Sequence, residues 1–183
     1  MPPVSDTQES PFFLSVNRGK RSVALDLKHP LGRQAFLDLV READAVIYGF
    51  ASDVPARLGL DHATLAGVNP RIVVGQLIGL DDQGAYAGAP AFDLMLQAMS
   101  GLMSITGEAG GKPVRVGYQV ADLAGGLYLA LGVAAGLVQA QASGTGERVQ
   151  VSLFDAQMAM LTWQAQGYPV SYTHLRAHET PEH

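Results

Sequence analysis

Residues 71–78 read Arg71-Ile72-Val73-Val74-Gly75-Gln76-Leu77-Ile78, and they decide the fold class. A short apolar run that is rich in β-branched residues and closed by a glycine predicts a buried strand. Similar runs precede it at Val23–Leu27 and Ala45–Tyr48, and apolar residues at helical spacing within Gly32–Ala43 lie between those two. Strands joined by helical crossovers predict a parallel sheet with right-handed connections. The expected fold is therefore α/β, a Rossmann-like parallel sheet with flanking helices.

The second half of the chain adds a loop, helices and another strand. Gly79–Pro90 is polar and glycine-rich, as loops over binding clefts often are, and a helix is expected at Phe92–Met99. Leu123–Val138 is nearly uncharged and approaches the length of about 20 residues that a membrane span needs. Its four glycines and its α/β setting favour a buried core helix instead. Arg148–Leu153 alternates with period two, as a strand does, and a last helix is expected from Phe154 through Leu161.

Composition narrows the function classes. The chain has 183 residues, 48% of them hydrophobic, which suits one domain or a piece of a larger one. Twelve basic and seventeen acidic residues give a net charge of -5, a balance that predicts neither nucleic-acid binding nor attraction to membranes. Cysteine is absent, so thiolate chemistry and disulfides are excluded. The absence of cysteine leaves the compartment open, with a cytoplasmic enzyme as the simplest expectation. The first ten residues do not have the pattern of a signal peptide.

Asp122 is the most informative single residue. It stands between an extended segment and a glycine-rich apolar run, in the context Gln119-Val120-Ala121-Asp122-Leu123-Ala124-Gly125-Gly126. An aspartate at a helix start is commonly an N-cap, which accepts hydrogen bonds from free backbone N–H groups. With small neighbours that leave room for a ligand, the same carboxylate can be a nucleophile that forms covalent intermediates. Local sequence leaves both alternatives open.

Several blocks, taken in order, resemble one family: the class III CoA-transferases, together with the related 2-methylacyl-CoA racemases. The block that contains Asp122 is one of them, and the blocks are residues 17–28, 43–50, 92–103, 117–126 and 145–153. The resemblance implies that residues 12–169 are a partial large domain of such an enzyme. Residues 1–11 are then expected to be a flexible N-terminal segment.

The resemblance also implies a chemistry. In this family an aspartate, matched here by Asp122, attacks an acyl-CoA thioester to give a mixed anhydride and then an aspartyl-CoA thioester. An acceptor carboxylate takes the CoA in a second exchange. The expected partners are therefore an acyl-CoA and a small carboxylic acid, with no prosthetic group and no metal. Relatives form interlocked dimers, so the intact protein is expected to be a homodimer.

The resemblance places further residues beside the coenzyme. Those expected to contact CoA are Leu25, Lys28, Tyr48, Gly49, Phe50 and Arg57. Lysine and arginine are the usual partners of phosphate groups. Many relatives have Asn where Gly49 stands, so the resemblance implies that one side-chain hydrogen bond to the coenzyme is not made here. The alternatives are a solvated strand-end charge for Lys28, a surface helix residue for Arg57 and core packing for Phe50.

Two polar residues of the block 92–103 are candidates for the substrate site. Asp93 matches an acidic position near the active centre of some relatives, and its alternative role is an N-cap for the helix that follows. Gln97, one turn later, could orient substrate or make a polar bond in the core. The racemase branch is the rival enzyme class, and it has His where Phe92 stands. Phenylalanine cannot transfer a proton, which favours the transferase.

A non-catalytic role is the remaining alternative. The family has further segments before Phe12 and after Gly167, so this chain is expected to be an inactive fragment or a non-catalytic subunit. Residues 170–183 do not resemble the family. They begin Val170-Ser171-Tyr172-Thr173-His174-Leu175-Arg176, which matches the translation of a common transposase sequencing adapter. The expectation is that this tail is not native.

Overall fold

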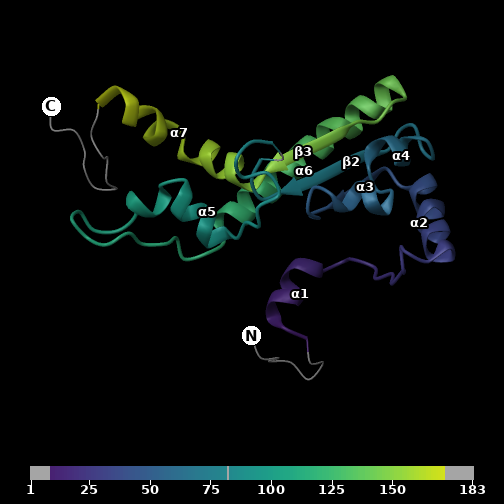
Figure 1. Cartoon of the computed structure of the whole chain (residues 1–183), viewed down its shortest axis with the longest axis horizontal. Coiled ribbons are helices and arrows are strands. Elements are labelled where there is room, and N and C mark those ends of the chain that lie inside the picture. Colours follow the sequence, from purple (N-terminus) through teal and green to yellow (C-terminus); the bar gives the residue numbers. More distant parts are fainter. Residues whose placement is uncertain (1–8, 82, 172–183) are drawn as a thin grey trace.

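The computed structural model describes residues 9–81 and 83–171, and its centre is a three-stranded parallel sheet (Figure 1). The strands are β1 (Ala45–Tyr48), β2 (Val73–Ile78) and β3 (Arg148–Ser152), in the order β1-β2-β3. Ala45 pairs with Val73, and Val74 pairs with Arg148. Helical crossovers join the strands, so the expected α/β class with a parallel sheet is confirmed.

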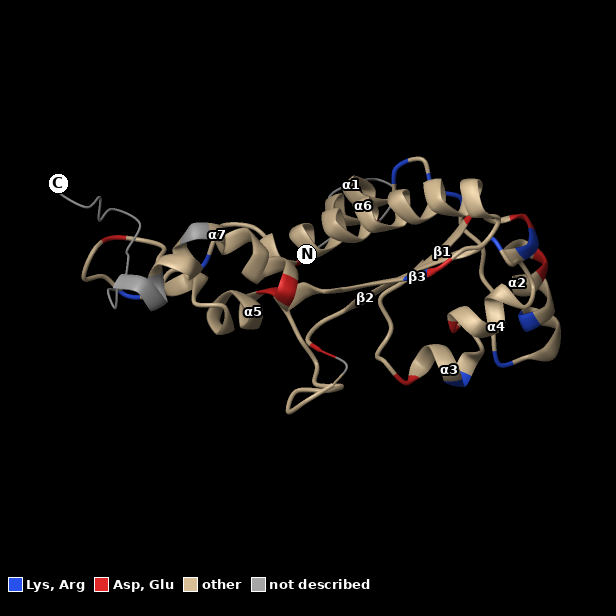
Figure 2. Ribbon diagram, turned by 90° about the horizontal axis from the view of Figure 1, so that it is seen from above, with Lys and Arg blue, Asp and Glu red and all other residues tan. Residues whose placement is uncertain are grey.

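Three helices cover one face of the sheet. They are α2 (Pro30–Glu42), α3 (Val54–Leu58) and α4 (His62–Ala66), and Figure 2 shows α3 and α4 on the side opposite α6. The core beneath them consists of Val40, Tyr48, Leu60, Leu65, Ile72 and Val74. Burial of these apolar side chains stabilises the layer, by about 25 cal/mol for each Å² of apolar surface removed from water.

The long helix α6 (Val120–Ser143) covers the other face. Leu129, Val133 and Ala140 pack on Val73 of the central strand. Gly75 of β2 allows the close approach, because a Cβ there would lie 2.8 Å from a methyl carbon of Val133. The helix ends at Gly144, whose φ of 77° is the left-handed conformation that favours glycine at a helix C-terminus.

The buried core helix expected at Leu123–Val138 is buried on one face only. Leu127, Leu131 and Val138 are 72%, 69% and 68% exposed, because the sheet covers a single side of the helix. Among the described residues α6 is the one helix long and apolar enough to cross a membrane by length and composition. The core helix of a soluble protein passes the same test of length and composition. One face of α6 packs on β2 and β3 and so belongs to the core of this fold.

Two more helices lie beyond the carboxyl ends of the strands. They are α5 (Asp93–Met99) and α7 (Leu153–Ser171), with the short 3-10 helix η1 (Leu102–Ser104) after α5. Leu80, Leu96, Ala121 and Leu153 form a third core cluster, which joins the start of α6 to both helices. This cluster fixes the position of the first turn of α6 relative to the sheet.

The N-terminal part of the described chain lies away from the sheet. Helix α1 (Pro11–Asn17) has no buried residue, and Figure 1 shows it beside an extended link that leads to α2. The expected strand at Val23–Leu27 is wrong, because residues 20–26 form no regular structure. A run of strand-forming residues becomes a strand only where a neighbouring strand accepts its hydrogen bonds, and none lies beside it in the described chain.

Two expectations fall largely outside the described residues. Residues 1–8 and 172–183 are not described, so the expected flexible segment 1–11 and the expected non-native tail 170–183 stay predictions. Val170 and Ser171 are the last two residues of α7.

Candidate functional site

A cleft of about 350 Å³ lies at the carboxyl edge of the sheet. Each of the three strands ends at this cleft. The residues that line the cleft are Gly49, Phe50, Ala51, Ser52, Leu77, Ile78, Gly79, Leu80, Asp81, Gly88, Ala89, Pro90, Ala91 and Leu153. In open parallel α/β sheets, ligands bind outside the carboxyl ends of the strands. The position of the cleft therefore marks it as the candidate binding site.

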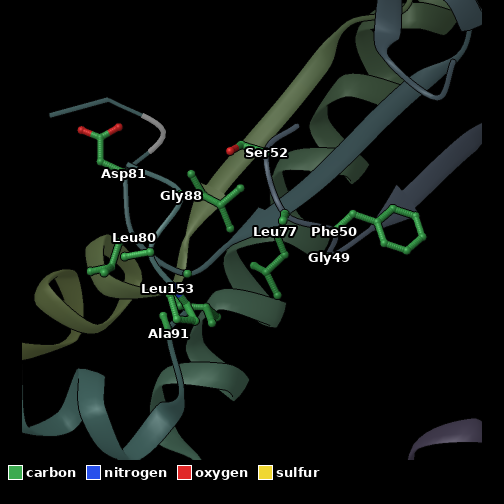
Figure 3. Close-up of a pocket in the computed structure, with 14 residues that line it drawn as sticks. Gly49, Phe50, Ser52, Leu77, Leu80, Asp81, Gly88, Ala91 and Leu153 are labelled. Atoms are coloured by element: carbon green, nitrogen blue, oxygen red, sulfur yellow. The ribbon is translucent and has the colours of Figure 1, made fainter. Parts of the chain in front are cut away.

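The walls of the cleft differ in polarity. In Figure 3, Leu77, Ala91 and Leu153 lie together on one side, and Ser52 and Asp81 lie on the other. The described lining contains no lysine or arginine. A mostly apolar cleft with few polar groups suits the uncharged arm of a ligand better than its phosphates. The glycine-rich loop 79–90 folds back over the strand end, since a Cβ on Gly79 would overlap Ala91.

Asp122 is in the first turn of α6, and the structure excludes the capping interpretation. The N-cap of α6 is Gln119, so Asp122 is already inside the helix. Asp122 is exposed, and its carboxylate accepts no hydrogen bond from any residue in the described ranges. One turn later, Gly125 contacts Leu153 so closely that a Cβ there would overlap the leucine side chain. Leu153 also lines the cleft, so α6 packs against the cleft wall one turn after Asp122, although Asp122 itself is not among the lining residues.

The carboxyl of Asp122 has an altered acidity. Partial burial raises its pKa above the usual aspartate range, and the nearby Asp93 carboxylate raises this pKa further. Both causes act against the charged form of the side chain. An aspartate that is uncapped, exposed and electrostatically destabilised is a candidate for covalent chemistry.

Asp93 and Gln97 lie together near Asp122, outside the lining of the cleft, and their role at a substrate site stays a prediction. The capping role considered for Asp93 is wrong, because Phe92 is the N-cap of α5 and makes no side-chain capping bond. Asp93 instead accepts a hydrogen bond from the Ala121 N–H of α6 at 2.8 Å. Its other oxygen accepts from Gln97 at 2.6 Å.

The residues predicted to contact CoA separate into two groups. Gly49 and Phe50 line the cleft, and the Phe50 ring stacks on that of Tyr48 with centroids 5.7 Å apart. Tyr48 is buried, and this burial raises the pKa of its hydroxyl.

The other predicted CoA contacts are not brought into the cleft. Arg57 is exposed on α3 and pairs with Asp53 at 3.0 Å. Lys28 is exposed and Leu25 half-buried on the link before α2. Their roles stay predictions.

Sequence reasoning missed several lining residues, among them Ser52, Ala91 and Leu153. The signal that could have found them is position, since each follows a strand end or the loop between two elements. Among the described residues, no group of three or more His, Asp or Glu side chains could hold a metal ion.

Comparison with known proteins identifies the family. A sequence model of CoA-transferase family III matches residues 1–182. The chain belongs to CoA-transferase family III. Succinate–glutarate CoA-transferase of Agrobacterium fabrum is 40% identical over 160 residues, which are 87% of this chain and 40% of that protein. Acetyl-CoA:oxalate CoA-transferase of Acetobacter aceti is 40% identical over 165 residues, covering 87% of this chain and 42% of that protein.

Solved structures share the fold of this chain. A CAIB/BAIF family protein from Brucella suis superposes with a TM-score of 0.80 at 34% identity, over 85% of this chain and 41% of that one. A protein from Mycobacterium tuberculosis superposes with a TM-score of 0.82 at 29% identity, over 91% of this chain and 48% of that one. This family III chain therefore spans about 40% of the length of the curated relatives that it matches.

Proposed function

We propose that the protein containing this chain transfers coenzyme A from an acyl-CoA to a free carboxylate, with Asp122 as the nucleophile. The observation that carries the proposal is the Asp122 carboxylate itself, exposed and without a hydrogen-bond donor in the described chain, one helix turn before Gly125, which packs against the cleft residue Leu153. Family membership and relatives named as CoA-transferases supply the reaction class.

The proposed reaction consists of four acyl exchanges. The Asp122 carboxylate attacks the thioester carbonyl, forming a mixed anhydride and releasing CoA thiolate. The thiolate attacks the Asp122 carbonyl, which gives an aspartyl-CoA thioester and frees the donor acid. The acceptor carboxylate then attacks this thioester, forming a second anhydride and thiolate. Attack of the thiolate on the acceptor carbonyl yields the new acyl-CoA and restores Asp122. Each enzyme-bound intermediate is an anhydride or a thioester, so an activated acyl bond is present until the product leaves.

The start of α6 suits the negative charge that develops in these steps. The N-terminal end of a helix carries a partial positive charge and free N–H donors. The N–H groups of Val120, Ala121 and Leu123 are engaged, by Tyr118, Asp93 and Gln119 respectively. The N–H of Asp122 has no acceptor among the described residues. We propose that it contributes to stabilising the oxyanion formed next to it.

The racemase alternative receives no support from the site. That chemistry needs an acid and a base on opposite sides of the carbon alpha to the thioester. Phe92, which stands where the racemase branch has His, is 73% exposed and has no group that can transfer a proton. The transferase is therefore the function that we propose.

Replacing Asp93 by Asn in the full-length protein tests the electrostatic part of the proposal. Asp122 must be ionised to attack, and the Asp93 carboxylate raises the pKa of Asp122. Removing that negative charge favours the ionised form, so the acid limb of the pH profile of kcat/KM is expected to move to lower pH. Asp38→Asn, on the exposed surface of α2, is the matched control. An acid limb that stays in place or moves to higher pH in Asp93→Asn contradicts the account.

The isolated 183-residue chain is expected to be inactive and to self-associate. It spans about 40% of its relatives, and α6 leaves a row of large apolar side chains exposed. Exposed apolar surface of this kind promotes association. A CoA-exchange assay combined with light scattering checks the expectation, and an active, monodisperse monomer would contradict it. We propose that the intact protein is a homodimer.

A further inference from the structure

The segment that leads into α6 is held by one buried glutamine of α5. Residues 112–116 form no regular structure, and a bend follows at 117–118. The Val116 N–H donates to Gln97 Oε1 at 2.8 Å, and Gln97 Nε2 donates to the Tyr118 carbonyl oxygen at 3.3 Å. Gln97 is 0% exposed, so these bonds do not compete with solvent. A buried amide that is fully engaged in this way orders the backbone around it.

The same glutamine reaches the first turn of α6 through Asp93. Its Nε2 also donates to Asp93 Oδ2 at 2.6 Å, and Asp93 Oδ1 accepts from the Ala121 N–H at 2.8 Å. Gln119, the N-cap of α6, makes no side-chain capping bond. The cap of this helix therefore comes from a neighbouring helix, and the Gln97–Asp93 pair holds the backbone at residues 116, 118 and 121.

We propose that Gln97 is a positioning residue that sets where the Asp122 carboxylate stands, by holding residues 116–121 both directly and through Asp93. The inference rests on the proposed role of Asp122 as the nucleophile. Gln97 itself does not line the cleft. Its effect on catalysis passes through the backbone that immediately precedes Asp122, where a displacement of about 1 Å can cost about a hundredfold in rate.

Gln97→Met and Gln97→Glu in the full-length protein test this role. Methionine has nearly the volume of glutamine and removes all three bonds, so kcat is expected to fall about a hundredfold while KM for the acyl-CoA changes little. Glutamate keeps an acceptor for the Val116 N–H but loses both donations, to Tyr118 and to Asp93, and places a second carboxylate against that of Asp93, so kcat is expected to fall at least as far as in Gln97→Met. If Gln97→Met does not fold, a wild-type kcat in Gln97→Glu still overturns the positioning role.

Gln157→Met is the matched control. Gln157 is 1% exposed, and neither polar atom of its side chain has a partner among the described residues. The same replacement at this second buried glutamine is expected to leave kcat unchanged. Amide hydrogen exchange of residues 115–122 gives a readout that is independent of turnover. It should become faster in Gln97→Met and stay at the wild-type rate in Gln157→Met.

The outcomes separate this inference from the proposed function. A wild-type kcat in Gln97→Met, or unchanged amide exchange of residues 115–122 in that variant, overturns the positioning role of Gln97. If Asp122→Asn is inactive at the same time, the proposed role of Asp122 as the nucleophile is unaffected. Substantial turnover by Asp122→Asn overturns the proposed function and this inference together. A fall in kcat with faster exchange in Gln97→Met, and neither change in Gln157→Met, supports the positioning role.

Discussion

Asp122→Asn in the full-length protein is expected to lower the rate of CoA exchange by about four orders of magnitude or more. Asparagine has nearly the shape of aspartate, but its amide cannot attack a thioester to form an anhydride. The first bond of the proposed reaction then cannot form. The measurement is the initial rate of exchange between an acyl-CoA and a free carboxylate, followed by chromatography of the CoA esters.

Asp38→Asn is the control for this loss. Asp38 is an exposed aspartate of α2 that pairs with Arg41, on a helix that does not line the cleft. The Asp38→Asn protein is expected to keep the wild-type rate of exchange, because an exposed ion pair contributes little to the stability of the fold. Substantial residual exchange by Asp122→Asn would mean that another carboxylate, with Asp93 as the nearest candidate, is the nucleophile.

Gly146→Ala is expected to produce the largest loss of stability. The Gly146 N–H donates to the Pro70 carbonyl oxygen at 2.8 Å. A Cβ on Gly146 would overlap the carbonyl oxygen of Ile72 and lie 2.6 Å from the carbonyl carbon of Arg71. Both contacts are to backbone, which cannot move without disturbing the pairing of β2 with β3. We expect a loss of about 3 kcal/mol or more in the free energy of unfolding.

Thermal denaturation of the full-length protein checks this expectation, with Gly126→Ala as the matched control. Gly126 is inside α6, and a Cβ there meets nothing within 4 Å. Alanine is the better helix former by about 1 kcal/mol, so the control is expected to raise Tm. A Gly146→Ala protein that melts at the wild-type Tm would contradict the described contact between the two strands.

The sheet could be predicted from the sequence because its strands are short apolar runs with clear ends. The runs at Ala45–Tyr48, Arg71–Ile78 and Arg148–Leu153 became β1, β2 and β3 with boundaries that differ by two residues at most. Val23–Leu27 has the same local pattern but no neighbouring strand. Propensity alone cannot separate these cases, since strand formation depends on long-range pairing.

The site could be predicted only in part, because its decisive contacts join distant residues. The block around Asp122 was found from its small neighbours and its family resemblance. The sequence did not show that α6 starts at Val120. Because the helix starts there, Asp122 lies inside it and is not at the capping position. The bond from Ala121 to Asp93 spans 28 residues, and no local pattern encodes it. Likewise, the composition of α6 does not show that only one of its faces is covered.

If Asp122 is the nucleophile, its carboxylate becomes covalently attached to CoA during turnover. The direct measurement is mass spectrometry of the full-length protein after brief incubation with an acyl-CoA in the absence of an acceptor acid, followed by acid quenching and proteolysis. We expect a peptide containing Asp122 that has gained the mass of CoA less one water, and no such gain in Asp122→Asn. Attachment at Asp93, or an active wild-type protein that never carries CoA on the Asp122 peptide, would contradict it.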